Sequence, residues 1–162
     1  MEVTFREYSD KDKQQLLELS KKLGAFGKSI DPMKRIQNAP GFAEMDVDET
    51  LENVKKYQGK ILLAEDNGKT LGFIIGVIWE QSEKNKLEIG PHILGEVVDL
   101  FLEDVYRGQG IGSKMLTLME EYFKSKGCDS MWVGTFAPNK DARKVYEKFG
   151  FVDRSIGMLK TI

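Results

Sequence analysis

The spacing of apolar positions changes several times along the first part of the chain, which predicts a strand followed by helices. Apolar and polar side chains alternate over residues 3–8, as in a half-buried strand. Leucines then recur at helical spacing over residues 9–23, and Gly24 is expected to end this helix. Residues 25–47 have no clear period and are expected to form an irregular connection of the kind that often belongs to a binding site. A second helix is expected over residues 48–57.

A hairpin is expected next, because two apolar runs flank a strong turn signal. Residues 61–65 and 70–79 have the length and β-branched content of strands, and they are joined through Asn67 and Gly68. The Asn-Gly pair favours the tight turns of β-hairpins, in which both central residues have positive φ.

The second half of the chain alternates between strand and helix patterns. Strands are expected at 96–102, 131–135 and 151–160, and helices at 110–126 and 139–149. This order predicts a mixed central β-sheet with helices on both faces, in the α/β (α+β) class. A length of 162 residues fits one domain over residues 1–162.

Composition narrows the protein class. The chain has 41% hydrophobic and 31% charged residues and a formal net charge of −2, with no basic stripe of the kind that nucleic acid requires. The longest apolar run, residues 71–79, is too short to cross a bilayer. The absence of a signal-peptide pattern and the single cysteine, Cys128, favour the cytoplasm. We expect no nucleic-acid or membrane partner and no metal site.

The most distinctive chemistry lies at residues 107–112 (RGQGIG), between an expected strand and an expected helix. Glycines let the backbone turn its N–H groups inward, and a helix N-terminus adds free donors and a positive dipole end. Such a loop suits a phosphate or pyrophosphate, although the same pattern also fits a plain tight turn. The spacing does not fit a dinucleotide-binding fingerprint.

Two blocks of sequence resemble the GCN5-related N-acetyltransferase (GNAT) superfamily. Residues 98–102 (VDLFL) leading to 107–112 (RGQGIG) fit its acetyl-CoA signature and the strand before it. Residues 139–142 (NKDA) and 145–151 (VYEKFGF) resemble its second conserved block. The two blocks stand in the family's order, and the expected elements extend the likeness over nearly the whole chain.

This resemblance implies the GNAT fold and acetyl-CoA as the cosubstrate. The strands over 97–103 and 131–135 would splay apart, often with a bulge in the first, and would bind the pantetheine arm through freed backbone groups. Main-chain groups of Phe101 and Leu102 would make that contact. The residues implied for the pyrophosphate are Arg107, Gly108, Gln109, Gly110, Ile111, Gly112 and Ser113. Asn139 would contact coenzyme A or cap the helix that it begins.

Three side chains are candidates for catalysis. Tyr146 matches the family's acid tyrosine, and the alternative is an ordinary core aromatic. Glu96 corresponds to the glutamate base of histone-acetylating relatives, and Asp99 lies nearer the acetyl end. Both could instead be surface acids that only attract a cationic amine. Residues three apart on a regular strand face opposite sides, so a bulge decides whether both reach the substrate.

The expected activity is transfer of an acetyl group to a primary amine of a small molecule or peptide. Direct transfer in a ternary complex is expected, because neither block contains a cysteine to carry an acyl group. The alternatives are a non-catalytic acyl-CoA sensor, an O-acceptor, or a longer acyl chain. The acidic residues Glu44, Asp46, Asp48 and Glu49 are either a solvated helix start or an attractor for a cationic acceptor. Relatives commonly form homodimers.

Overall fold

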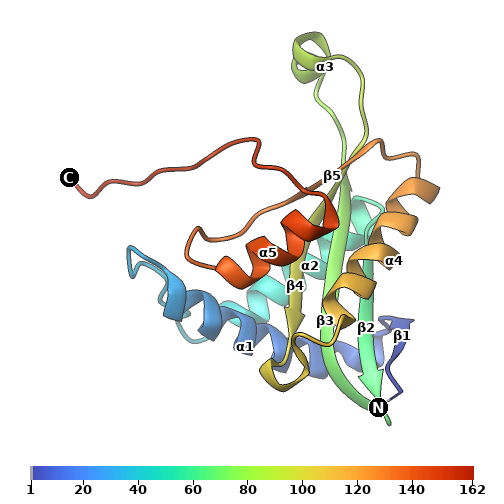
Figure 1. The fold of residues 1–162 in the computed structure, drawn as a ribbon, viewed down its shortest axis with the longest axis vertical. Coiled ribbons are helices and arrows are strands. Elements are labelled where there is room, and N and C mark those ends of the chain that lie inside the picture. The colour runs from blue at the N-terminus through green and yellow to red at the C-terminus, as the bar shows by residue number, and fades with distance from the viewer. Residues whose placement is uncertain (1) are drawn as a thin grey trace.

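A five-stranded mixed sheet, with strand order β1-β2-β3-β4-β5, organises the chain (Figure 1). The computed structural model describes residues 2–162. Its strands are β1 (Thr4–Glu7), β2 (Lys60–Asp66), β3 (Lys69–Trp79), β4 (Leu94–Leu102) and β5 (Ser130–Val133). Its α-helices are α1 (Lys13–Ile30), α2 (Phe42–Lys56), α3 (Glu83–Ile89), α4 (Ile111–Ser125) and α5 (Lys140–Phe149). Strands β1 to β4 are antiparallel neighbours and β4 pairs with β5 in parallel, which confirms the expected mixed architecture.

Helices cover both faces of the sheet, because the central strands send apolar side chains to each side in turn (Figure 1). Ile61 and Leu63 of β2 pack in the core beneath α1 and α2. Leu62 and Ala64 pack in a second core beneath α4. The near-continuous burial of β3 fits its place at the centre of the sheet.

The expected hairpin between β2 and β3 is confirmed. Asn67 and Gly68 have φ values of 50° and 78°, and the strand pairing closes at Asp66 opposite Lys69. Both central residues thus take the left-handed conformation that Asn-Gly tolerates.

The expected end of the first helix at Gly24 is wrong. Helix α1 continues to Ile30, and the cap at Asp31 donates its N–H to the carbonyl of Gly27. The Asp31 carboxylate accepts backbone N–H bonds from the following turn, and Pro32 prevents the helix from continuing. A helix tolerates an interior glycine at a cost of about 1 kcal/mol when flanking turns and packing favour it.

Three other expectations also need correction. Helix α2 begins at Phe42, earlier than expected, so the irregular connection is shorter. Helix α3 lies in the polar stretch after β3, where Ser82 caps it by accepting from the N–H of Asn85. Residues 151–160 form no strand, since the segment after α5 has no strand neighbour within the described chain.

An ion cluster holds β1 to the turn before α1. Arg6 Nη1 lies 2.7 Å from Asp12 Oδ2, and Arg6 Nη2 lies 2.6 Å from Glu65 Oε1. Asp12 is buried and also accepts the N–H of Ser9 at 2.8 Å. The bonds from Arg6, joined by those from Ser9, hold the pKa of Asp12 well below its usual range.

The change Asp12→Asn is expected to lower the free energy of unfolding by about 1–3 kcal/mol at pH 7, since it weakens charge-assisted hydrogen bonds. A depressed carboxyl pKa stabilises the fold above the unfolded-state value and loses that effect as the pH falls. The difference between wild type and variant should therefore shrink below about pH 4. Urea titrations at pH 7 and pH 3 measure it, and an equal difference at both would contradict this origin.

Candidate active site

The two parallel strands separate in the middle of the sheet. Residues 94–97 of β4 pair with 130–133 of β5, and β4 then continues to Leu102 with β3 as its only strand neighbour among residues 2–162. The edge of β4 that faces β5 beyond Val97 is therefore free of strand pairing. This is the splayed pair that the family resemblance implied, and it leaves a gap in which an extended ligand can bind backbone groups.

A bulge in β4 lies at the point where the strands separate. Asp99 pairs with Ile75 and Val97 pairs with Gly76, so Val98 is an extra residue in the ladder. Glu96 pairs with Val77, which lies on the same face of β3 as Ile75. Glu96 and Asp99 therefore face the same side of the sheet despite being three residues apart.

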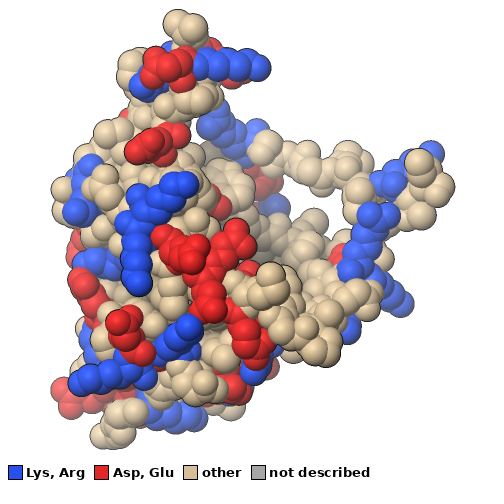
Figure 2. All heavy atoms as spheres, turned by 180° about the vertical axis from the view of Figure 1, so that it is seen from behind, with Lys and Arg blue, Asp and Glu red and all other residues tan. Residues whose placement is uncertain are grey.

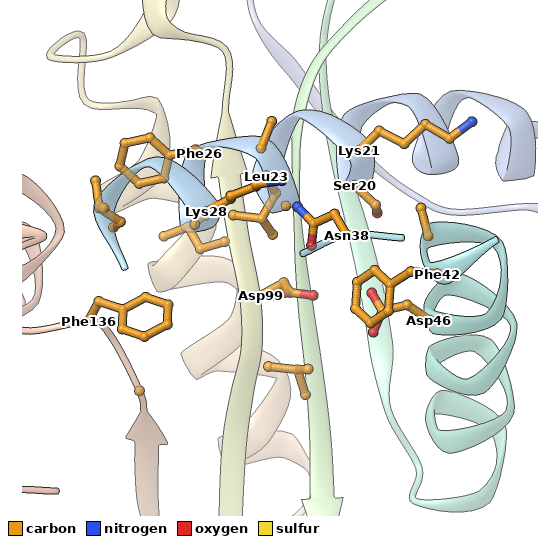
Figure 3. Close-up of a pocket in the computed structure, with 18 of the residues that line it drawn as sticks. Ser20, Lys21, Leu23, Phe26, Lys28, Asn38, Phe42, Asp46, Asp99 and Phe136 are labelled. Atoms are coloured by element: carbon orange, nitrogen blue, oxygen red, sulfur yellow. The ribbon is translucent and has the colours of Figure 1, made fainter. Parts of the chain in front are cut away.

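A cavity of about 990 Å³ opens over this bulge (Figure 3). Its walls come from the C-terminal half of α1, the connection 37–41, the start of α2, residues 97–100, residues 133–136, and two side chains at α5. The connection after α1 was expected to serve a binding site, and its residues do line this cavity. The candidate residues that line it are Asp99, Asn139 and Tyr146.

Asp99 points into the cavity from β4, and Asp46 of α2 points toward it from across the opening (Figure 3). Burial, together with the negative charges of Asp46 and Glu96, raises the pKa of Asp99 to about 6. The pKa of Asp46 is also raised, by desolvation and by Glu49. A carboxyl group that titrates near neutral pH is suited to accept a proton.

Tyr146 reaches the same cavity from the other wall. Its ring packs edge-on against Phe151 with 5.8 Å between ring centroids, while its surroundings connect with the α4-side core. Burial, together with the charge of Asp99, raises the pKa of the phenol to about 12. The hydroxyl therefore keeps its proton at neutral pH, as a proton donor must. Tyr146 is thus packed against the α4-side core and also lines the cavity.

Glu96 lies outside the cavity lining. Its carboxylate accepts a hydrogen bond from the indole Nε1 of Trp79 on the neighbouring strand. Glu96 faces the same side of the sheet as Asp99. It lies three residues earlier in β4, however, and its carboxylate is bound by the side chain of Trp79.

Of the four acids of the run in α2, two line the cavity and two do not. Glu44 and Asp46 line it, with Glu44 3.1 Å from the ammonium of Lys21. Asp48 instead pairs with Lys13 at 2.6 Å. Figure 2 shows acidic side chains gathered beside a hollow on this face of the protein. The cations Lys21 and Lys28 also line the cavity, and Lys21 is paired with Glu44. Asp46 and Asp99 form no ion pair with the described residues, and these two acids favour a cationic group on their side of the cavity.

The glycine loop forms an open turn in front of α4. Gly108 and Gly110 have φ values of 74° and 82°, which favour glycine, and a Cβ at either position would meet no atom within 4 Å. The backbone N–H groups of residues 108–113 have no acceptor among the described residues. Ile111 is buried in the α4-side core and anchors the turn. Free donors at a helix N-terminus form a site for an anion.

Arg107 adopts a position that the sequence did not indicate. Its Nε donates to the carbonyl of Leu102 at 2.9 Å, and its guanidinium lies 5.2 Å from the ring centroid of Phe26 and pairs with Asp104. This side chain thus connects the loop to β4 and α1. Phe101 packs under α1 and α2, so its side chain belongs to the core.

The remaining candidates have local structural roles. Gln109 Nε2 donates to the carbonyl of Val105 at 3.1 Å, within the turn. Ser113 and Gly112 lie in the first turn of α4, and Ser113 is exposed. Asn139 caps α5 by accepting the N–H of Ala142 at 3.3 Å, and it also lines the cavity. The loop residues 107–113 do not line the cavity, although Arg107 lies against Phe26, which does.

The sequence did not single out the other cavity walls. Phe26, Phe42 and Phe136 line the cavity from α1, α2 and the segment after β5. The one sequence signal for these walls was the lack of a clear period over residues 25–47, which contain Phe26 and Phe42.

Within residues 2–162, no group of three or more His, Cys, Asp or Glu side chains is arranged to hold a metal ion, and no helix has the length and hydropathy of a membrane span.

Comparisons with known proteins find N-acetyltransferases among the proteins that resemble this chain. An uncharacterised N-acetyltransferase of Methanocaldococcus jannaschii is 29% identical over 105 residues, which are 64% of this chain and 43% of that protein. A thialysine N-epsilon-acetyltransferase of Bos taurus is 28% identical over 159 residues, or 93% of this chain and 85% of that one. The chain aligns with 43%, 54% and 36% of the lengths of the first three curated relatives.

The fold is also shared with solved structures. A predicted acetyltransferase from Clostridium acetobutylicum, crystallised with acetyl-CoA, superposes with a TM-score of 0.75 at 19% identity, covering 99% of this chain and 96% of that one. The family model described as the acetyltransferase (GNAT) family matches residues 29–151. This match covers most of the sequence, including the bulged strand, the glycine loop and α5, and the chain therefore belongs to the GNAT family.

Proposed function

We propose that the protein is an N-acetyltransferase that moves an acetyl group from acetyl-CoA directly to a primary amine. One observation carries the proposal: Asp99 and Tyr146 enter one cavity at the point where β4 and β5 separate. The first has its pKa raised to about 6 and the second to about 12. A proton acceptor and a proton donor are thus available at the same place.

Acetyl-CoA fits the separate parts of the site. The free N–H groups of residues 108–113 suit its pyrophosphate, and the unpaired edge of β4 beyond Val97 suits the amides of its pantetheine arm. The acetyl-CoA in the Clostridium acetobutylicum structure supports this assignment by analogy. Arg107 would act by holding the loop against Leu102, and Asn139 by shaping the cavity at the start of α5.

Asp99 and Tyr146 have complementary roles in the proposed reaction. Asp99 takes a proton from the acceptor ammonium, and the neutral nitrogen attacks the thioester carbonyl carbon. A C–N bond forms and the C–S bond breaks. Tyr146 gives its proton to the departing sulfur, so coenzyme A leaves as the thiol. The acylated nitrogen then gives its second proton to the Tyr146 phenolate, which restores the phenol, and Asp99 releases the first proton to solvent. Direct transfer needs no protein nucleophile, and Cys128, the single cysteine of the sequence, lies outside the cavity.

The acceptor is proposed to be a cationic amine. Asp99, Asp46 and Glu44 line the cavity, and a second positive group on the acceptor would lie favourably near the acids of α2. The relative named for thialysine supports a small acceptor with an amino group on a flexible arm.

A thiol-release assay with acetyl-CoA tests the proposal against diamines, polyamines, aminoglycosides, amino acids and basic peptides. Amines with a second cationic group are expected to give turnover, and alcohols of the same length are not. Tight acetyl-CoA binding without turnover on any acceptor would favour the sensor alternative. Turnover with alcohols, or only with longer acyl donors, would assign a different transfer.

The change Gly110→Ala is expected to raise KM for acetyl-CoA by roughly tenfold, because loss of one or two aligned N–H donors costs about 1–2 kcal/mol. Steady-state kinetics at saturating amine measure it. Gly68→Ala is the matched control, since Gly68 has a φ of 78° and a Cβ there would also meet no atom within 4 Å. In both variants the alanine must adopt a similar positive φ, so the backbone strain is comparable. An equal change in KM in the two would contradict a binding role for the loop.

A further inference from the structure

The two tryptophans of the chain lie on one face of the sheet, on either side of Glu96. Glu96 of β4 stands opposite Trp132 of β5 in the parallel register, so the two side chains share a face. Across the other edge of β4, Glu96 stands opposite Val77 of β3, and Trp79 follows two residues later on the same face. The group Trp79, Glu96 and Trp132 is called the indole surface below.

Neighbouring groups fix both indoles. The ring centroids of Trp79 and Tyr57 are 4.4 Å apart, and the Nε1 of Trp79 donates to Glu96. The indole of Trp132 lies along its strand over Gly134, where an added Cβ would be 2.8 Å from the ring. Trp79 and Trp132 are still 36% and 42% exposed. Both rings are therefore held in place while part of each remains open to a ligand.

The indole surface extends the cavity along the sheet. Gly134, over which the indole of Trp132 lies, is itself part of the cavity lining. The β3 partners of Asp99 and Glu96 are two residues apart, so these two acids are separated by about 7 Å along the sheet. A ligand with one end at Asp99 can therefore reach Glu96 with its other end.

The chemistry of the indole surface suits an organic cation. Aromatic faces attract ammonium groups, and those of tryptophan do so most strongly. Lys56 follows this preference within the chain, with its ammonium 4.8 Å from the ring centroid of Tyr57. Glu96 forms no ion pair with any of residues 2–162, and only its Oε2 accepts a hydrogen bond from them. The carboxylate between the two indoles therefore has no positive partner within this part of the chain.

We propose that the indole surface binds a second cationic group of the acceptor, at the far end of the chain that carries the reacting amine. The proposal rests on the proposed function, in which Asp99 receives the proton of that amine. Bonds of about 1.5 Å allow a flexible chain of roughly five to seven bonds to connect two nitrogens at this separation. Glu44 and Asp46 line the cavity itself and remain available to acceptors too short to reach Glu96. Glu96 thus selects the acceptor by its length and charge and takes no part in the proton transfer.

Thiol release from acetyl-CoA measures this selection. The probes are cadaverine, a five-carbon diamine whose nitrogens are six bonds apart, and the amino alcohol of the same length. Glu96→Gln keeps an oxygen that can accept from Trp79 and removes the charge. It is expected to lower kcat/KM for cadaverine by about tenfold and to leave kcat/KM for the amino alcohol unchanged. Glu120→Gln removes the same charge from α4, on the opposite face of the sheet, and should change neither value.

Two results of this assay would overturn the proposal. An unchanged kcat/KM for cadaverine in Glu96→Gln would mean that the far end of the acceptor does not reach the indole surface. An equal loss with cadaverine and with the amino alcohol would place Glu96 in the reaction itself.

The indole N–H signals of an isotope-labelled chain test binding without catalysis, because the sequence contains only these two tryptophans. Cadaverine, added with coenzyme A present, is expected to shift both signals in the wild type and to shift them much less in Glu96→Gln. Trp132→Leu removes one signal and so assigns the pair. Signals that stay in place at saturating cadaverine would overturn the proposal, even if acetyl transfer occurs. Shifted signals without turnover on any amine would support the cation site and contradict the proposed function instead.

Discussion

Replacing Tyr146 by phenylalanine is expected to lower kcat by about 10²- to 10⁴-fold, the usual contribution of a positioned general acid. The variant keeps the ring that packs against Phe151 and loses only the hydroxyl of this cavity-lining side chain. The leaving sulfur would then depart without its proton, whereas the binding of acetyl-CoA should change little. The measurement is thiol release at saturating concentrations of both substrates.

The matched control for this change is Tyr122→Phe. The hydroxyl of Tyr122 donates to the carbonyl of Gln58 at 2.7 Å, and this residue does not line the cavity. Its loss should cost about 1 kcal/mol of stability and leave kcat unchanged. A normal kcat in Tyr146→Phe would remove the acid role, while equal losses in both variants would point to a general effect on folding.

Changing Asp99 to asparagine is expected to lower kcat/KM by a similar factor and to alter its dependence on pH. A base must be ionised to act, so wild-type kcat/KM should fall as the pH drops through about 6, the pKa of this carboxyl group. Asparagine does not titrate, and the fall near pH 6 should disappear in the variant. Profiles of log kcat/KM against pH, with the same acceptor for both proteins, provide the comparison.

Stability gives an independent test of the same residue. A carboxyl group whose pKa is raised on folding destabilises the fold increasingly as the pH rises above its unfolded-state value, and to the full extent above its folded-state pKa, here about 6. Asp99→Asn should therefore raise the free energy of unfolding at pH 7, by about 1–3 kcal/mol for a shift of this size. Glu96→Gln distinguishes between the two candidate bases. Because Glu96 binds Trp79 outside the cavity, this variant should keep the fall in kcat/KM near pH 6. If Glu96→Gln abolishes the pH 6 limb and Asp99→Asn does not, the base is Glu96.

Much of the donor side of the site could be predicted from the sequence. The run at 107–112 has glycines at the positions where the backbone needs positive φ, and these are local requirements that a sequence records directly. The order of the elements followed from the hydrophobic pattern, and the splayed strands followed from the family resemblance. The inward position of Arg107 could not be predicted, because it depends on Phe26 of α1 and the Leu102 carbonyl, which only the folded chain brings together.

The electrostatics of the acceptor side also required the structure. The raised pKa of Asp99 depends on burial and on Asp46, which comes from a helix far away in the sequence. The expectations at Gly24 and over residues 151–160 were wrong for a related reason. Glycine only favours a helix end, and a segment whose residues suit a strand does not show which strand it joins.

The extra residue Val98 has a consequence for comparisons between related chains. Removing it would leave Val97 opposite Gly76 and Asp99 opposite Ile75, so every other side chain of β4 would keep its side of the sheet. In a regular strand, the loss of one residue reverses all side chains on one side of the deletion. A relative aligned with a one-residue gap at this position can therefore share the same core and the same pair of acids, with the two acids two residues apart instead of three.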